Sequence, residues 1–287
     1  MAQIIRFIPA LRVHSWGGFG SQLFTAYVIL KLQKRFPGRR IKVVIHTAGV
    51  TRRITEFNFE QLGVKAIQVE DYKSGTVDHD SNEWSLSFFR QMRRITSALF
   101  IPILTWLNIF QTANSDDSFA AIRLWTLIVR GHYTKLTRDK HLLENLFDFL
   151  YKADYTRTKN MDILALHYRL GDLLNLSTKE PIKIERIDSL LKQVPFNTDS
   201  KFLLTDSSIE ELSISLEQSS NLSFFRVVNY DPLTTLWFCI TANDFVGTNS
   251  KISIWATIFR SALFNKESFL PKELEGPFDT IGLVKRY

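Results

Sequence analysis

Short apolar runs alternate with stretches of helical spacing along most of the chain. Near the start, Leu23, Tyr27 and Leu30 keep the spacing of one helix face, and Pro37-Gly38 predicts where that helix ends. The pattern predicts strands at residues 4–8, 41–45 and 66–69, and helices at residues 23–36 and 57–62. We therefore expect a strand–helix–strand unit whose first turn is the glycine-rich stretch WGGFGSQLF, residues 16–24.

The second half of the chain repeats this alternation, and its strands end in polar residues just before helices. We expect strands at residues 163–166, 201–204, 224–228 and 245–247, and helices at residues 184–194, 209–216, 232–242 and 252–264. The polar strand ends are residues 167–172 (HYRLGD), 205–206 (TD) and 248–251 (TNSK). In open α/β sheets, ligands bind at the carboxyl ends of the strands. The predicted fold class is α/β and GT-B-like in layout, with two Rossmann-like domains, 1–155 and 156–287, facing a cleft.

The middle of the chain does not follow this alternation. Residues 95–115 contain no charged side chain, and they follow the basic residues Arg90, Arg93 and Arg94. Pro102 and several polar residues keep the stretch below the hydropathy of a membrane span. We expect a buried helical hairpin in the domain core, with an interfacial membrane contact through 95–115 as the alternative.

Composition and charge narrow the classes of function. A hydrophobic fraction of 45% in 287 residues is typical of a packed globular protein. The net charge of +7 favours anionic partners, but no RNA-recognition or zinc-finger pattern accompanies it, so nucleic acid is not expected. One cysteine, Cys239, and the lack of an export signal predict a cytoplasmic protein. No P-loop and no His-x-x-x-His pattern occurs, and we expect no metal.

Six segments, taken together, resemble the α1,2-fucosyltransferases of glycosyltransferase family 11. WGGFGSQLF resembles the family's GGLGNQ-F start, LHYRLGD its His-x-Arg-Arg-x-Asp motif, and FVGTNSKISIWATIF its Asn-Ser-Thr-x-Ser-Trp-Trp segment. FLLTDSSIEEL is similar to a strand ending in Ser-Asp-Asp, RGHY to a Gly-Tyr-Phe-Gln segment, and EPIKIERIDSLL to a Pro-Ile-x-Tyr helix. The order and spacing agree from residue 16 to about residue 260. The resemblance implies a GT-B fold whose C-terminal domain binds a nucleotide-sugar donor and whose N-terminal domain faces the acceptor.

The resemblance also implies a reaction: inverting, metal-independent transfer of fucose or another sugar to a hydroxyl of a glycan acceptor, in surface polysaccharide synthesis. Arg169 would hold the departing diphosphate, because a guanidinium stays charged and can contact two phosphate oxygens. Asp172 would orient Arg169, and either His132 or His14 could act as the base. Ser250 and Lys251 precede a helix, where backbone N–H groups favour a phosphate. The motifs add these donor-site candidates: Gly18, Gly20, Ser21, Gln22, His167, Asp206, Thr235 and Asn249.

Three positions depart from the family pattern. Leu170 stands in place of a second arginine, Ser21 in place of an asparagine, and Thr235 where a guanine-recognising carboxylate is expected. A GDP-sugar stays the first expectation, but these departures leave other nucleotides open. Lys251 would replace the positive charge that is missing at Leu170. The expected acceptor is an oligosaccharide or a lipid-linked glycan at the inner face of the membrane.

Two other functions stay open. One is a noncatalytic nucleotide- or sugar-binding protein. The other is a metal-dependent GT-A glycosyltransferase that uses Asp78 and Asp80, whose spacing has the Asp-x-Asp form.

Overall fold

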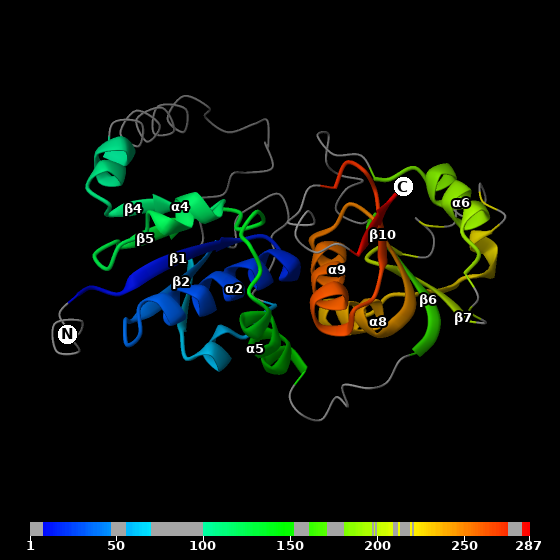
Figure 1. The fold of residues 1–287 in the computed structure, drawn as a ribbon, viewed down its shortest axis with the longest axis horizontal. Helices are drawn as coiled ribbons and strands as arrows, with labels where there is room; N and C mark the ends of the chain where they lie inside the picture. The colour runs from blue at the N-terminus through cyan, green and yellow to red at the C-terminus, as the bar shows by residue number, and fades with distance from the viewer. Residues whose placement is uncertain are drawn as a thin grey trace, which may run out of the picture. The chain divides into compact units, whose positions relative to one another are not determined.

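A computed structural model describes residues 8–46, 56–69, 100–151, 161–170, 181–196, 198, 200–208, 212, 219, 221–274 and 283–287. The chain divides into two compact units, Met1–Thr137 and Arg138–Tyr287 (Figure 1). Each unit contains one parallel sheet with helices packed on it. The predicted α/β class with two Rossmann-like units is confirmed. The cleft, and the assignment of an acceptor side and a donor side, stay predictions.

The N-terminal unit is built on five described parallel strands in the order β3-β2-β1-β5-β4. The strands are β1 (Leu11–Trp16), β2 (Ile41–His46), β3 (Lys65–Val69), β4 (Phe110–Thr112) and β5 (Ile128–Arg130). Helix α2 (Phe19–Arg35) packs on one face of this sheet through a nearly continuous buried surface that includes Leu23, Phe24 and Tyr27. The 3₁₀ helix η1 (Phe59–Leu62) precedes β3, and the short helix α4 (Asp116–Ala120) is tied to α2 by the ion pair between Lys31 and Asp116.

The C-terminal unit has six described parallel strands in the order β11-β10-β9-β6-β7-β8. The strands are β6 (Met161–Tyr168), β7 (Ser200–Thr205), β8 (Arg226–Val228), β9 (Ala242–Gly247), β10 (Ser268–Leu270) and β11 (Val284–Arg286). The chain adds β7 and β8 on one side of β6, then returns to add β9, β10 and β11 on the other side. This is the strand order of a doubly wound dinucleotide-binding sheet, and the direction reverses between β6 and β9.

Three described helices pack against this second sheet: α6 (Ile184–Gln193), α8 (Pro232–Thr241) and α9 (Lys251–Phe264). A fourth, α5 (Lys140–Tyr151), packs on α9. The core beneath α9 holds Trp255 and Phe259, both fully buried. Arg260, on the same helix, is also fully buried, and its guanidinium donates hydrogen bonds to the carbonyl oxygens of residues 239, 240, 242, 243 and 267. It fastens α9 to the segment that joins α8 to β9.

Two predictions about local structure need correction. The strand before the glycine-rich turn is Leu11–Trp16, whereas most of the predicted strand at 4–8 lies outside the described residues. The helical hairpin predicted for 95–115 is wrong in its described part, because residues 100–106 form a helix and Phe110–Thr112 form the edge strand β4. In the part of the chain that is described, no helix is both long enough and apolar enough to span a membrane.

Candidate functional site

The carboxyl ends of β6 and β9 lie side by side, because residues 164–167 of β6 pair with residues 244–247 of β9. These two strands flank the point where the order of the sheet reverses. A crevice at such a point is where doubly wound sheets bind their ligands. Arg169 follows β6 directly, and residues 248–250 join β9 to α9. The predicted residues Arg169, Asn249, Ser250 and Lys251 are therefore brought together at this end of one sheet.

Thr248 fastens the two strand ends to each other. Its hydroxyl donates to the carbonyl oxygen of His167 at 2.9 Å and accepts from the backbone N–H of Arg169 at 3.1 Å. Its own N–H also donates to the His167 carbonyl, at 3.1 Å. Thr248 is 1% exposed, so these bonds are shielded from water. The backbone from which the Arg169 side chain projects is thus fixed by a residue that the sequence analysis did not select.

Asp206 also holds the backbone after β6, from the side of β7. Its carboxylate accepts a hydrogen bond from the backbone N–H of Leu170 at 2.9 Å. Asp206 follows β7, so this contact joins the chain beyond β6 to the end of β7. Together, Asp206 and Thr248 hold residues 169–170 from both neighbouring strands. Asp172, the predicted partner of Arg169, lies outside the described residues.

The first turn of α9 comes unusually close to the end of β9. A Cβ atom placed on Gly247 would lie 2.7 Å from the Cβ of Ser253 and 2.7 Å from a methyl carbon of Leu270. Ser253 is fully buried, and its hydroxyl is 2.9 Å from Nδ1 of His167. Burial lowers the pKa of His167 to about 4; the Asp206 charge opposes this shift and the Arg169 charge adds to it. His167 is therefore neutral near pH 7, and it links β6 to α9.

The N-terminus of α9 begins at the end of β9. Ser250 is the N-cap residue, and its hydroxyl accepts from the backbone N–H of Ile252 at 3.1 Å. Lys251 is the first residue of the helix and is half-buried. A helix of 14 residues presents partial positive charge at its N-terminus, and a lysine there adds a full charge. With Arg169 on the neighbouring strand end, this arrangement can hold a phosphate or a diphosphate.

Thr235 lies in the first turn of α8 and is buried. Its hydroxyl donates to the carbonyl oxygen of Tyr230 at 3.3 Å, so its hydrogen atom is used within the turn. The adjacent N-cap, Asp231, accepts from the N–H groups of Leu233 and Thr234 at 3.0 and 3.1 Å. Neither side chain is arranged as an open carboxylate for recognising a base.

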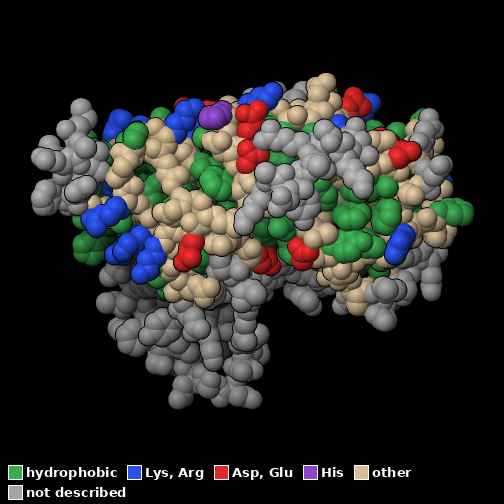
Figure 2. All heavy atoms as spheres, turned by 90° about the horizontal axis from the view of Figure 1, so that it is seen from below, with side chains coloured by type: hydrophobic (Ala, Val, Ile, Leu, Met, Phe, Trp, Pro, Cys, Tyr) green, Lys and Arg blue, Asp and Glu red, His purple; other side chains and the backbone are tan. Residues whose placement is uncertain are grey.

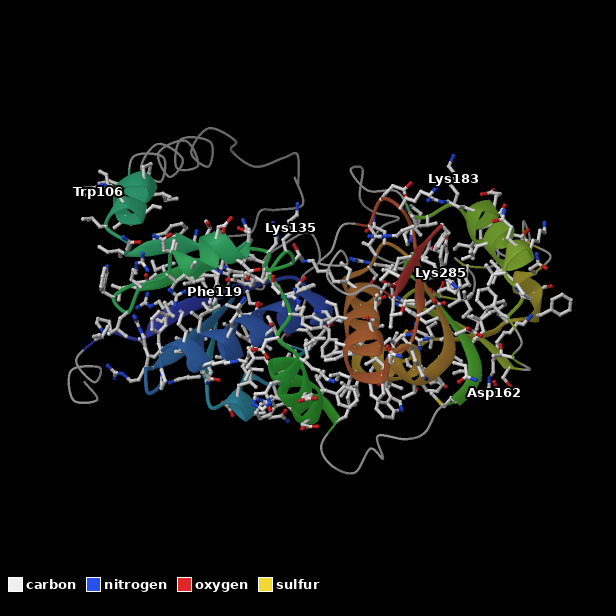
Figure 3. All side chains as sticks on the ribbon, in the orientation of Figure 1. Trp106, Phe119, Lys135, Asp162, Lys183 and Lys285 are labelled. Atoms are coloured by element: carbon white, nitrogen blue, oxygen red, sulfur yellow. The ribbon has the colours of Figure 1, made fainter. Side chains whose placement is uncertain are left out.

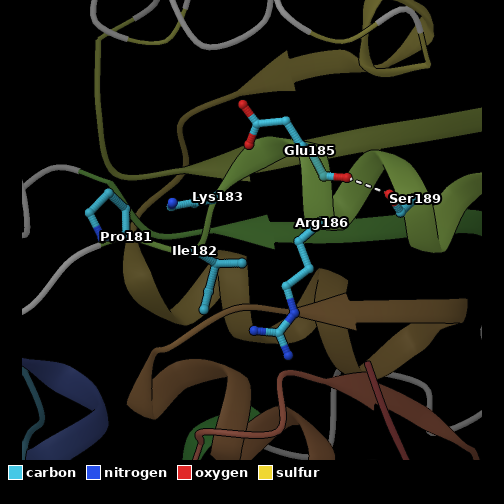
Figure 4. Close-up of a pocket in the computed structure, with 6 residues that line it drawn as sticks. All are labelled: Pro181, Ile182, Lys183, Glu185, Arg186 and Ser189. Atoms are coloured by element: carbon cyan, nitrogen blue, oxygen red, sulfur yellow. Dashed lines mark hydrogen bonds between the residues drawn. The ribbon is translucent and has the colours of Figure 1, made fainter.

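A pocket of about 400 Å³ lies at the start of α6, in the segment that resembles the Pro-Ile-x-Tyr helix (Figure 4). Residues Pro181 to Lys183 form one part of it, and Glu185, Arg186 and Ser189 of α6 complete it. The hydroxyl of Tyr168, the last residue of β6, donates to the carbonyl oxygen of Ile182 at 3.1 Å. The pocket therefore opens near the carboxyl end of β6. Lys183 extends away from the ribbon (Figure 3).

The glycine-rich turn of the N-terminal unit has a different construction. Gly17 has a φ of 83°, and Gly18 is the N-cap of α2. The carboxylate of Glu56 accepts the backbone N–H of Phe19, so the first turn of this helix already holds an internal anion. The side chain of Gln22 is fully buried, donates to the Gly17 carbonyl at 3.1 Å, and accepts from the N–H groups of residues 56 and 57 at 2.9 Å each.

The other predicted residues of this turn, Gly20 and Ser21, lie in the first turn of α2; Gly20 is buried and Ser21 half-buried. Hydrogen bonds to residues 56 and 57 therefore occupy part of this turn, and that part is not open to a ligand. The role of Gly18, Gly20, Ser21 and Gln22 in donor binding stays a prediction.

Two buried histidines lie near the carboxyl end of the N-terminal sheet. Nδ1 of His14 is 2.7 Å from Nε2 of His46, so one ring donates and the other accepts. Trp16 stacks on His46 with ring centroids 4.4 Å apart, and the guanidinium of Arg130 lies over the Trp16 ring. His132 is exposed and follows Gly131, whose φ of 154° only glycine adopts readily. Both candidate bases thus belong to the same end of this sheet.

Four residues of these sites were not predicted from the sequence: Thr248, Ser253, Glu56 and His46. The residues 248–251 were noted as a polar strand end, but Thr248 was given no role. His46 is the last residue of β2, and His14 lies in the neighbouring strand β1. The two rings come together only because β1 pairs with β2. Asp78 and Asp80 lie outside the described residues. Among the residues that are described, no group of three or more His, Cys, Asp or Glu side chains could hold a metal ion.

Comparison with known proteins gives a likeness in fold only. No family model matches the chain, and no curated protein matches it. A solved structure assigned as a UDP-N-acetylglucosamine 2-epimerase from Listeria monocytogenes has a TM-score of 0.50 at 13% identity, covering 97% of this chain and 84% of its own.

Two further solved structures match less closely. The E. coli heptosyltransferase WaaC with ADP has a TM-score of 0.43 at 12% identity, covering 97% of this chain and 93% of its own. A glycosyl transferase of family 9 from Veillonella parvula has a TM-score of 0.43 at 11% identity, covering 97% and 86%. At these identities the epimerase match supports the α/β fold class, and the other two add no argument. The resemblance to family 11 is not confirmed.

Proposed function

We propose that the protein is a glycosyltransferase that transfers a sugar from a nucleotide-sugar donor to a hydroxyl of a glycan acceptor. One observation carries the proposal: a cationic side chain and a helix N-terminus meet where the order of a doubly wound sheet reverses. The six segments in family order support the same conclusion.

The chemistry of sugar transfer fits this arrangement. As the bond from the anomeric carbon to the diphosphate breaks, negative charge grows on the phosphate oxygens. The guanidinium of Arg169 and the N–H groups at the start of α9 would stabilise that charge, and Thr248 and Asp206 already hold the backbone from which the Arg169 side chain extends. We propose that Lys251 supplies the second positive charge, at the position closest to the phosphate next to the sugar. The transfer is proposed to be inverting and to need no metal.

The donor is proposed to be a nucleoside diphosphate sugar, with a GDP-sugar as the first candidate. Thr235 cannot bind both N–H groups of a guanine edge as a carboxylate does. Its hydroxyl already donates to the carbonyl oxygen of Tyr230. A donor with another nucleoside is therefore the alternative. We propose that the pocket of about 400 Å³ at α6 binds part of the nucleoside.

We also propose that the protein works at the inner face of the membrane, on a lipid-linked or oligosaccharide acceptor. The helix at residues 100–106 presents Phe100, Ile103 and Trp106 with 59%, 52% and 80% of their surface exposed. These positions are three residues apart, so they share one side of the helix. Figure 3 places Trp106 on this helix. In the sequence, this segment follows the basic residues Arg90, Arg93 and Arg94, and exposed apolar side chains combined with basic residues favour an interfacial contact.

The experiment that tests the donor site is a thermal-shift screen of GDP, UDP, ADP, CMP and dTDP. A nucleotide present at 100 times its Kd stabilises the folded state by about 2.7 kcal/mol. We expect one nucleotide to stabilise the wild type, and Arg169→Ala to remove that effect. Lys140→Ala, an exposed residue at the start of α5, serves as the control for loss of one positive charge. Equal stabilisation of all three proteins would refute the site.

A further inference from the structure

A second cationic site lies in the N-terminal unit, at the opposite end of its sheet from the glycine-rich turn. A pocket of about 480 Å³ opens where β2 and β3 begin, beside the last turns of α2. Its charged lining residues are all basic: Arg39, Arg40, Lys42 and Lys65. The rest of the lining is Gln33, Phe36, Gly38, Ile41, Gly63 and Val64, so among the residues that the structure describes no carboxylate lines this space.

The register of the sheet brings the two lysines of this pocket next to each other and next to a third cation, Arg12. Lys42 pairs with Lys65 on β3 and with Arg12 on β1, so three cations form one row across neighbouring strands. Neighbouring strands are about 4.8 Å apart, and like charges at paired positions repel. Within the described part of the chain, neither lysine side chain makes a hydrogen bond or an ion pair. The strand register thus places three positive charges in one row, and two of them line the pocket.

Arg39 contributes a buried guanidinium to the same pocket. It is only 6% exposed, and its guanidinium donates to the carbonyl oxygens of Thr126 at 2.5 Å and of Pro9 and Arg123 at 3.5 Å each. Its Nε–H is buried and has no partner among the described residues. Like Arg260, Arg39 is held by neutral carbonyl oxygens, so within the described part of the chain its positive charge has no carboxylate beside it. Burial lowers the pKa of Arg39, the direction expected of a cation without a carboxylate beside it.

We infer that this pocket binds a phosphate group, either a free diphosphate or the headgroup of an anionic lipid. Phosphate carries more than one charge and several acceptor oxygens, so it can be shared among two lysines and two arginines. A space of about 480 Å³ accommodates a diphosphate or a phosphodiester headgroup. Figure 2 shows Lys and Arg side chains gathered on the exposed surface of the N-terminal unit, at the left of the view. This inference stands independently of the proposed sugar transfer.

The test compares two double variants that lose the same charge. Lys42→Gln/Lys65→Gln removes the paired lysines of the pocket, and Lys140→Gln/Lys272→Gln removes two exposed lysines elsewhere. Both are made in an Arg169→Ala background, so that the proposed donor site contributes nothing. Thermal unfolding without ligand checks that each protein folds. Because Arg39 is buried, it is left unchanged.

Two probes distinguish the sources of phosphate. The first is sodium pyrophosphate, titrated by calorimetry at low ionic strength, where charge interactions are least screened. The second is flotation with vesicles of phosphatidylcholine alone, and with vesicles of equal parts phosphatidylcholine and phosphatidylglycerol. We expect the pocket variant to bind the effective probe roughly tenfold more weakly than the control, which is about 1.4 kcal/mol.

Each outcome decides the inference. Selective loss of pyrophosphate binding supports a free diphosphate ligand, and selective loss of binding to the anionic vesicles supports a lipid headgroup. If neither probe binds the Arg169→Ala protein, the inference is wrong. It is also wrong if the two double variants lose binding equally, because that result indicates general attraction to a basic protein.

Discussion

Replacing Thr248 with valine tests whether the strand ends beneath Arg169 are held as described. Valine has nearly the shape of threonine but no hydroxyl. The change removes one hydrogen bond to the His167 carbonyl, and it leaves the N–H of Arg169 without its 3.1 Å partner in a place that is 1% exposed. The His167 carbonyl still accepts from the Thr248 N–H, which valine retains. Only one group is therefore orphaned.

The size of the effect follows from these contacts. A buried hydrogen bond contributes about 1 kcal/mol, and an orphaned buried N–H costs about 1–3 kcal/mol, so Thr248→Val is expected to destabilise by about 2–3 kcal/mol. Thr248→Ser is the matched control. It keeps the hydroxyl and loses one methyl group, so we expect a loss of about 1 kcal/mol.

Urea unfolding measures both variants, and the nucleotide thermal shift measures whether the site still binds. Thr248→Val should lose most of the nucleotide-induced shift, because the backbone beside Arg169 is no longer fixed, whereas Thr248→Ser should retain it. A Thr248→Val protein as stable as wild type would contradict this role of the Thr248 hydroxyl. Greater destabilisation by Thr248→Ser than by Thr248→Val would contradict it as well, since packing of the methyl group would then outweigh the hydrogen bonds.

Four further predictions follow from the fold and the site. Arg260→Met should destabilise the protein by about 3 kcal/mol or more, because several buried carbonyl oxygens lose their donor; a melting temperature within a few degrees of wild type would contradict this. Gly247→Ala should cost about 1–3 kcal/mol and weaken nucleotide binding, since the new methyl group meets the Cβ of Ser253 and a methyl carbon of Leu270 at 2.7 Å each; stability and nucleotide binding equal to wild type would contradict this. The pKa of His167 is about 4 in the folded protein and 6.5 in the unfolded chain, so the unfolded state binds more protons between these two pH values. The free energy of unfolding should therefore fall as the pH drops from 6.5 to 4. His167→Gln should flatten this part of the stability curve, and an unchanged slope would exclude His167 as its source. Chelation with EDTA should leave sugar transfer unchanged, and loss of activity that Mn²⁺ restores would favour the Asp78/Asp80 alternative.

Much of the fold was predictable because the strands of the C-terminal unit are apolar runs that end in polar residues. The run at 163–166 identified β6, and Thr248-Asn249-Ser250 marked the end of β9, so Arg169 and the start of α9 could be placed at one edge. The spacing of apolar residues also fixed α9 almost to the residue.

The remaining elements could not be read from local pattern. β1 carries Arg12 and His14 on one face and was missed, because its polar residues interrupt the apolar run. The strand β4 was taken as helix because FQT is short and follows an uncharged stretch. Its place in the sheet is decided by pairing with β5, which the sequence does not display.

The contacts that hold the candidate site depend on distant partners. Leu170 meets Asp206 across 36 positions, and Arg169 meets Thr248 across 79. The pairing of Lys42 with Lys65 is likewise a product of strand register. Local spacing identifies which residues carry chemistry, whereas the side chains that position them follow only from the sheet order.

The most direct test of the proposed sugar transfer is the release of nucleoside diphosphate from the nucleotide sugar identified by the thermal-shift screen. The measurement is made on the wild type, Arg169→Ala and Lys251→Ala, with Lys140→Ala as the control. We predict that wild type and control turn over, that Arg169→Ala has no activity above background, and that Lys251→Ala raises KM while keeping most of kcat. Full activity in both Arg169→Ala and Lys251→Ala would contradict the account. Tight nucleotide binding with no turnover in any of the proteins would identify a noncatalytic binding protein instead.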